Sequence, residues 1–300
     1  MFRLLREQKG AAVAVIAISM TAMIGFAALV IDGGNLYLNK TRLVNLADAA
    51  ALAGAQDLPG DPQSAIASAY SYAAQNGMSN DTIDVTISND NTVVTVNASR
   101  TVPFFFAQIF HMNSSNVSAR AAAAIKPITG VGNIVPFGIV KQPFKYNQTY
   151  TLKAGGGSGY NGNYAALALG GTGSTIYEGN ITNGYKGQLL IDKLVTTETG
   201  VMSGATSKGV KARMEQDKYA TFETMEKNSP RILTVPIIES LEVNGRGEVL
   251  VVGFAAFFLE DIGGNGHENY VTGKFIQTVV LGDTGTGTAN YGLYGSSLIE

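Results

Sequence analysis

The sequence has 300 residues, of which 45% are hydrophobic and only 15% are charged, whereas an average soluble domain carries about 25% charged residues. The formal net charge is -2, so the chain has no excess of positive charge with which to bind nucleic acid. Cysteine is absent and only two histidines are present. This composition excludes disulfides and thiol chemistry and leaves little material for histidine-based sites.

The first predicted element is an uncharged apolar run at residues 11–31. A helix of this length measures about 30 Å, which is enough to cross the hydrocarbon core of a membrane. Arg3, Arg6 and Lys9 precede the run, and Asp32 is the first charged residue after it. Because positive flanks remain on the cytoplasmic side, these residues predict a single-pass protein of the cytoplasmic (inner) membrane, with its N-terminus inside and the rest of the chain outside.

A cleaved secretory signal is the alternative interpretation of this segment, because it also begins with a basic region and ends near small residues. The apolar core of such a signal is usually shorter, about 7–15 residues. The sequence after Ile31 offers no clean cleavage site, although Ala27 and Ala28 are small. An uncleaved anchor is therefore the favoured prediction.

Residues 35–58 predict a helix with an apolar stripe, in which Ala47, Ala50, Ala51 and Gly54 recur at spacings of three and four. Small residues allow another backbone to approach a helix closely. The favoured partner for this face is the protein's own sheet. The alternative is a neighbouring copy of the chain or another membrane helix.

The next segment predicts a small α+β unit. Asp61 and Pro62 provide a helix cap and a first-turn proline, and the alanine-rich helix that follows is expected to end near Gly77. The apolar period then changes from 3.6 to 2, which indicates strands. The expected elements are a hairpin with strands at 83–87 and 93–96, a short apolar helix from Pro103, and a strand at 116–125.

These segments resemble the N-terminal part of the TadG-like branch of the TadE/TadG family of Tad (Flp) pilus-assembly proteins. The resemblance rests on Gly10 before the apolar run, on Asp32 and Tyr37 after it, and on the run NLADAAALAGA at residues 45–55, its most specific part. The segments TVPFFFAQIF and VSARAAAAI are also similar to that family, so the resemblance covers residues 9–126.

The resemblance implies a non-catalytic, membrane-anchored accessory or minor structural component of a type IVb-like Tad pilus or secretion apparatus. The implied partners are membrane lipid and other Tad pilus-assembly or pilin subunits, with self-association left open. Processed pilins of that machine normally carry a glutamate five residues after the glycine, and Val15 occupies this position. This departure favours an anchored protein over a processed pilin.

The composition changes near Gly130, because 29 of the 36 glycines lie in the last 171 residues. Glycine and asparagine between short β-branched or aromatic runs indicate turns that join strands. Residues 127–300 therefore predict a mainly antiparallel β domain with one helix at 206–219. The expected strands lie at 134–140, 148–153, 164–169, 189–191, 231–241, 248–259 and 270–281.

The sequence as a whole thus predicts an α+β protein with four parts. They are a basic cytoplasmic flank (1–10), a transmembrane helix (11–31), an extracytoplasmic α+β unit (32–126) and a glycine-rich β domain (127–300).

Motifs that carry catalysis or bind cofactors give no support for an enzyme. Gly157, Gly159 and Gly162 fit G-x-G-x-x-G but lack the strand-to-helix context of a dinucleotide loop. Residues 263–268 resemble one calcium-binding nonapeptide, and a single copy cannot form the stacked sites of such repeats, so a plain hairpin loop is favoured. The sequence predicts no catalytic, cofactor-binding or metal-binding residue.

The alternative function is an anchored surface adhesin or polysaccharide-binding protein. It depends on exposed tyrosines that could stack on sugar rings, and the competing interpretation is that they pack within the strands. The candidates are Tyr160, Tyr164, Tyr177 and Tyr185.

Overall fold

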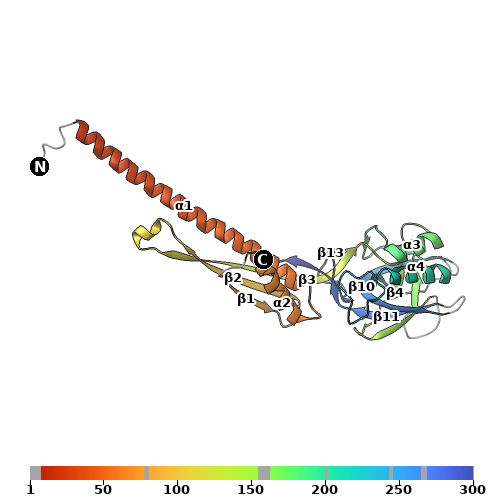
Figure 1. Ribbon diagram of the computed structural model, residues 1–300. Helices are drawn as coiled ribbons and strands as arrows, with labels where there is room; N and C mark the ends of the chain where they lie inside the picture. The colour runs from red at the N-terminus through yellow and green to blue at the C-terminus, as the bar shows by residue number, and fades with distance from the viewer. Residues whose placement is uncertain are drawn as a thin grey trace.

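The computed structural model describes residues 8–77, 81–154, 163–199, 202–242, 246–264 and 269–299. The molecule is elongated (Figure 1): half of a long helix projects from one end, a small unit packs around the other half, and a larger unit lies beyond. We call these two bodies the proximal unit, which contains the second half of the long helix and the described residues of 56–131 and 293–299, and the distal unit, which contains the described residues of 137–276.

Helix α1 spans Gln8–Ala55 without interruption, a length of 48 residues. At 1.5 Å per residue it is a rod of about 72 Å. The sequence predicted one helix at 11–31 and another at 35–58, and the structure corrects this to a single helix. Gly33 and Gly34 do not break it, because a glycine costs a helix only about 1 kcal/mol relative to alanine.

Helix α2, Pro62–Gln75, begins where the sequence predicted. The Asp61 carboxylate accepts hydrogen bonds from the backbone N–H of Ser64 at 2.9 Å and from its hydroxyl at 2.7 Å, which satisfies a free donor of the first turn. Ala65, Ala69 and Ala73 are buried along one face of the helix and share one apolar core with α1. The short side chains allow the two helices to lie close together.

The proximal sheet begins with the predicted hairpin. Strands β1, Thr82–Ile87, and β2, Val93–Pro103, are antiparallel, and β2 pairs along its whole length with β3, Ser114–Val131. Pro103 ends β2 instead of opening a helix. This part of the prediction was wrong, because only the four-residue 3-10 helix η1, Ala107–Phe110, forms in the connection.

Strand β3 continues through residues 127–131, where the sequence suggested a boundary, and it buries Ile128 and Val131. The last strand, β14 at Leu293–Leu298, then returns to pair with β3 in the antiparallel sense. Short strands β12, Thr278–Val279, and β13, Asp283–Thr284, join this sheet through β14 and β3. The distal unit is thus inserted between β3 and β14, and the division of the chain at residues 126 and 127 stays a prediction.

The strands of the distal sheet follow the order β11, β5, β6, β4, β9, β10 and β8. Because β10 also pairs with β11, six of them form a closed ring. Most neighbours are antiparallel, and the pairs β5–β6 and β4–β9 are parallel. The strands are β4 (Phe137–Val140), β5 (Thr149–Ala154), β6 (Asn163–Ala166), β8 (Leu194–Thr196), β9 (Ile232–Ile238), β10 (Glu248–Gly263) and β11 (Tyr270–Ile276), with β7 (Leu189–Leu190) on β3.

Two helices, not the one predicted, cover the distal sheet: α3 at Ser174–Asn183 and α4 at Ser203–Glu215. They are buried against each other at Gly209, where an added Cβ would lie 2.8 Å from the Cβ of Ile181. The absence of a side chain at Gly209 therefore allows the two helices to pack closely at this position. Side chains of β10 alternate between two cores, Phe257 on the helix side and Phe258 on the other.

Candidate membrane and assembly interface

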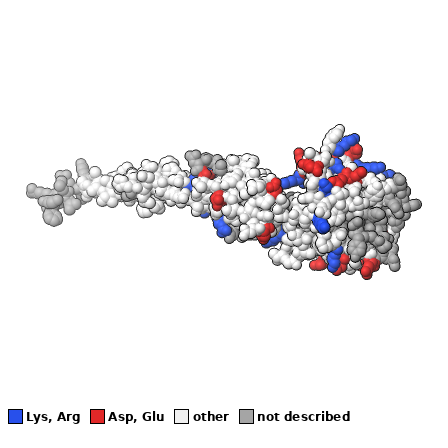
Figure 2. All heavy atoms as spheres, turned by 90° about the horizontal axis from the view of Figure 1, so that it is seen from below, with Lys and Arg blue, Asp and Glu red and all other residues white. Residues whose placement is uncertain are grey.

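The projecting half of α1 is apolar and exposed. Among the described residues, α1 is the one helix long and apolar enough to cross a membrane, and no residue of its most apolar window is buried. Figure 2 shows charged side chains over the two units and none on the visible face of the projecting helix. Its exposed large side chains are Val13, Val15, Ile16, Ile18, Met20, Met23, Ile24, Phe26, Leu29, Val30 and Ile31.

The residues expected to set the topology lie in different environments. Arg3 and Arg6 fall outside the described residues, and Lys9 lies in the first turn of α1, with its side chain outside the description. Asp32 is buried, although the sequence suggested only that it marks the end of the apolar run. Its position after Ile31 places it where the exposed helix enters the proximal unit.

The Asp32 carboxylate holds the connection between β2 and β3. It accepts backbone hydrogen bonds from Phe105 at 2.7 Å, from Phe106 at 3.1 Å and from Ala107 at 2.7 Å. Hydrogen bonds from several N–H groups to one ionised carboxylate are strong. The end of the apolar run is therefore fixed to a loop 73 positions further along the chain, a contact that sequence spacing could not indicate.

A second polar contact connects α1 to the hairpin beyond this point. Arg100 donates from Nε and Nη2 to the two oxygens of Asp81, at 2.6 and 2.7 Å, and from Nη1 to Asn39 on α1 at 3.0 Å. The hydrogen bond to Asp81 raises the pKa of Arg100, against the opposing effect of burial. These residues, whose roles the sequence pattern did not indicate, connect α1 to β2 and to the start of β1.

The predicted small-residue face lies inside the proximal unit. Ala47, Ala50 and Ala51 are fully buried, and they share a core with α2 and the sheet. A Cβ added at Gly54 would lie 2.9 Å from the backbone oxygen of Ala65 on α2. In this structure the face is occupied by the protein's own elements.

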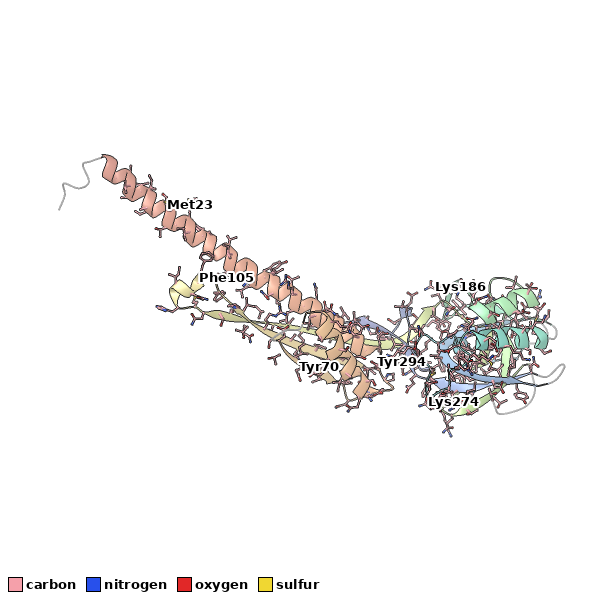
Figure 3. All side chains as sticks on the ribbon, in the orientation of Figure 1. Met23, Tyr70, Phe105, Lys186, Lys274 and Tyr294 are labelled. Carbon is pink, nitrogen blue, oxygen red and sulfur yellow. The ribbon has the colours of Figure 1, made fainter. Side chains whose placement is uncertain are left out.

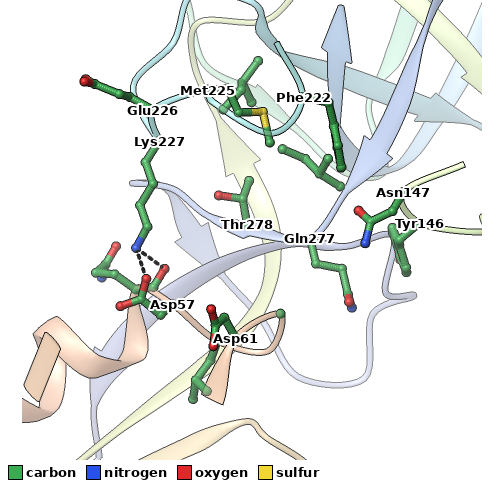
Figure 4. A pocket seen from close by; sticks show the side chains of 15 residues that line it. Asp57, Asp61, Tyr146, Asn147, Phe222, Met225, Glu226, Lys227, Gln277 and Thr278 are labelled. Carbon is green, nitrogen blue, oxygen red and sulfur yellow. Dashed lines mark hydrogen bonds and ion pairs between the residues drawn. The ribbon is translucent and has the colours of Figure 1, made fainter. Parts of the chain in front are cut away.

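A cavity of about 230 Å³ lies at the junction of the two units. The turn between α1 and α2 lines one side, and distal residues including Tyr146, Phe222 and Lys227 line the other (Figure 4). Lys227 forms an ion pair with Asp57. Burial raises the pKa of Tyr146 to about 12, with smaller contributions from Tyr294 and Tyr150, so its hydroxyl remains neutral at physiological pH.

The polar groups of this cavity hold the fold together. Asp57 accepts from Lys227 and from the Ser68 hydroxyl, and Asp61 caps α2. Within the described residues, no three His, Cys, Asp or Glu side chains gather closely enough to hold a metal ion. The Asp57 and Asp61 carboxylates of this cavity therefore take part in contacts within the fold.

Of the tyrosines proposed for the alternative function, Tyr177 is not exposed for stacking on a sugar ring. Tyr177 is buried, in contact with Phe137 at a ring-centroid distance of 6.4 Å, and its hydroxyl lies 3.3 Å from that of Thr206. Tyr185 is half-buried. Tyr160 and the side chain of Tyr164 lie outside the described residues, as do Gly157, Gly159, Gly162 and residues 265–268.

The fold and these contacts define an α+β protein carried on one long N-terminal helix, whose projecting half has the length and composition of a membrane anchor. Residues 10–57 match the family described as "Putative Flp pilus-assembly TadE/G-like". This confirms the resemblance over α1 and the turn that follows it. No curated protein and no solved structure matches the chain.

Proposed function

We propose that this protein is a non-catalytic, single-pass accessory or minor structural component of a Tad (Flp) pilus or secretion apparatus. It resides in the cytoplasmic membrane, with its N-terminus inside and both units outside. The observation that carries the proposal is the coincidence of the TadE/G-like match at residues 10–57 with α1, a helix that is exposed and apolar in one half and buried in the other.

The division of α1 into two halves supports a structural role. The uncharged run of 21 residues matches the thickness of a bilayer core, whereas Leu43, Leu46 and the small-residue face are part of the proximal core. Because the helix is continuous, the membrane segment and the extracytoplasmic fold are joined without a flexible linker. Such a protein presents its distal unit in a fixed direction, which suits a component of an assembled machine.

The orientation is supported by the flanking charges. Arg3, Arg6 and Lys9 precede the apolar run, and basic flanks favour the cytoplasmic side. Replacing all three with glutamate tests this argument, with Glu215→Lys on the distal surface as a control for a charge reversal away from the apolar run. The triple variant is expected to lose its orientation, measured by protease access to the distal unit in intact cells, while the control keeps it.

Fractionation and co-purification from native cells test the function itself. The full chain is expected in the membrane fraction, with its N-terminal segment intact by mass spectrometry and with other pilus components bound after mild solubilisation. A mature chain that begins between Ala28 and Asn35 would contradict the anchor. An intact, membrane-bound chain that co-purifies with no pilus component would instead contradict the role in the apparatus.

A further inference from the structure

The connection between β2 and β3 carries exposed apolar side chains at the end of the hairpin that lies nearest the projecting helix. Phe105, Ile109 and Met112 are 63%, 73% and 56% exposed. Residues 101–119 contain no Asp, Glu, Lys or Arg. Figure 3 shows Phe105 at this end of the hairpin, beside α1.

This connection is held in a defined conformation. The Asp32 carboxylate binds three consecutive backbone N–H groups in it, and the Phe104 side chain is buried. His111 has a φ of 60° and reverses the chain after η1, and the backbone N–H of Phe104 donates to Asn113 at 3.0 Å. The apolar side chains are therefore presented outward by a fixed loop.

The position of the loop along the axis of α1 follows from the hydrogen bonds that Asp32 accepts. Asp32 directly follows Ile31, the last residue of the apolar run, so the loop lies where the helix leaves the hydrocarbon core. Burying the Asp32 carboxylate against backbone donors also removes its need for water, which suits a group close to the bilayer. Tyr37, 76% exposed, lies about 8 Å further along the axis, at a depth that interfacial tyrosines favour.

We propose that Phe105, Ile109 and Met112 enter the outer interface of the lipid bilayer and form a second membrane contact beside α1. The partner is lipid, because the loop is held against α1 by Asp32, directly after the last residue of the exposed membrane segment. A binding site for a protein would be expected to have a polar rim with charged groups around an apolar centre, and this loop carries no carboxylate, lysine or arginine. The inference rests on the anchor in the proposed function.

The consequence is control of orientation. A single helix can tilt and rotate in a bilayer, and its tilt is set by packing and by interfacial anchors. A second contact on one side of α1 would fix the rotation of the protein about the helix. The distal unit, joined to α1 through the proximal unit, would then face one direction along the membrane.

Site-specific spin labelling tests this contact in the full chain, which contains no cysteine. Ile109→Cys and Met112→Cys are labelled with a nitroxide in nanodiscs that hold one copy each. The accessibility of each label to oxygen, which concentrates in lipid, is compared with its accessibility to a water-soluble nickel chelate. Met23→Cys serves as the lipid reference and Tyr219→Cys, 89% exposed on the distal unit, as the water reference.

We expect the labels at Ile109 and Met112 to favour oxygen over nickel, as at Met23, and the label at Tyr219 to show the opposite preference. If the labels at both loop positions behave like the label at Tyr219 while the label at Met23 lies in lipid, the proposed membrane contact is wrong. The membrane anchor is then still supported. A label at Met23 that is exposed to nickel would contradict the anchor itself. Immobile loop labels that are protected from both reagents would overturn the lipid assignment and indicate a protein contact.

The Asp32 contact provides an internal check. Asp32→Ala removes the acceptor that fixes the loop, so the Ile109 label is expected to shift from oxygen toward nickel accessibility. Asp48→Ala, also on α1, is the matched control and is expected to leave the label in lipid. An Ile109 label that stays in lipid in both variants would show that the loop does not need Asp32 for its position, which contradicts the proposed geometry.

Discussion

Lys227, in the segment before β9, forms an ion pair with Asp57, which lies just after the end of α1, and so connects the distal unit to the helix. The same ammonium donates to the backbone oxygen of Gln56 at 3.1 Å. The partners differ in burial, since the Lys227 side chain is 61% exposed and that of Asp57 only 11%. Asp57 also accepts a hydrogen bond from Ser68 on α2 at 2.6 Å.

This asymmetry predicts unequal effects of the two substitutions. Lys227→Met should lower the free energy of unfolding by less than about 1 kcal/mol, because an exposed ion pair contributes little. Asp57→Ala should cost more, since it leaves the Ser68 hydroxyl without its acceptor. Urea unfolding of the full chain in detergent measures both. Lys218→Met, which removes an exposed pair with Glu215 on α4, is the control, and equal losses for Asp57→Ala and Lys227→Met would contradict the asymmetry.

In Gly54→Ala, helix propensity and packing are expected to have opposite effects on the free energy of unfolding. Alanine favours a helix over glycine by about 1 kcal/mol, but the new Cβ would lie 2.9 Å from the Ala65 oxygen and 3.2 Å from Val94. A backbone carbonyl cannot move aside as a flexible side chain can, so we expect a net loss of about 1–3 kcal/mol. Gly34→Ala, with no atom within 4 Å of the added Cβ, should be neutral or stabilising. The thermal unfolding midpoint should therefore fall for Gly54→Ala and stay the same or rise for Gly34→Ala.

Leucine substitutions distinguish packing within the chain from contact with a partner. Ala50 is fully buried in the proximal core, whereas Ala74 on α2 is exposed. Ala50→Leu should lower the free energy of unfolding by about 1–3 kcal/mol through overpacking, and Ala74→Leu should have little effect. Denaturant unfolding of the purified chain measures this. If Ala50→Leu keeps the wild-type midpoint but loses co-purification with pilus components, the face serves a partner instead.

Elements with local signals could be predicted from the sequence, and those that depend on distant contacts could not. Asp61 and Pro62 mark the start of α2 because a cap acts within one helical turn. Helix α3 was missed because Gly173 gives it no side-chain cap, and its stability comes from burying Tyr177 and Ile181. Strand β14 was also missed, because LYGSSL has a weak pattern and gains its place by pairing with β3.

The same distinction holds for the candidate site. The small-residue face was recognisable because residues three and four apart share one side of a helix. The roles of Asp32 and Arg100 were not, since their partners Phe105 and Asn39 lie 73 and 61 positions away. Asp32 and the segment TVPFFFAQIF both carried the family resemblance, but nothing in their spacing indicated that the two meet.

The start of α2 should respond to acid. The backbone N–H of Ser64 and then its hydroxyl hold the pKa of Asp61 below its ordinary value, which is about 3.9 in an unfolded chain. Because the folded pKa is the lower one, the stabilisation is present above about pH 4 and is lost as the pH falls through the folded pKa. Asp61→Asn retains a capping acceptor without a charge.

We therefore expect wild type to exceed Asp61→Asn in urea midpoint at pH 7, with a difference that stays constant to about pH 5 and shrinks below about pH 4. Repeating the comparison in a Ser64→Ala background, which removes the hydroxyl donor, should reduce the pH-dependent part. A difference that grows on acidification would show that the charge of Asp61 does not stabilise the cap.

The last prediction concerns the insertion of the distal unit between β3 and β14. Residues 295–298 pair with 123–126 on β3. Leu293 pairs with β12 and is buried in a distal core, and Tyr294 pairs with both β12 and Pro127 of β3. Removing residues 295–300 from the full chain should lower its stability, because it leaves an edge of β3 unpaired and removes the hydrogen bond between Gln56 and Ser296.

The same truncation should have the opposite consequence in a fragment that starts at residue 127. There the partners at 123–126 are already absent, so residues 295–300 present an unpaired edge that favours aggregation. We expect the fragment 127–294 to unfold cooperatively and to remain monomeric at concentrations where 127–300 associates, as measured by circular dichroism and light scattering. If the truncation destabilises both the full chain and the fragment, residues 295–300 stabilise the distal unit directly, and the insertion topology does not describe how the two units fold.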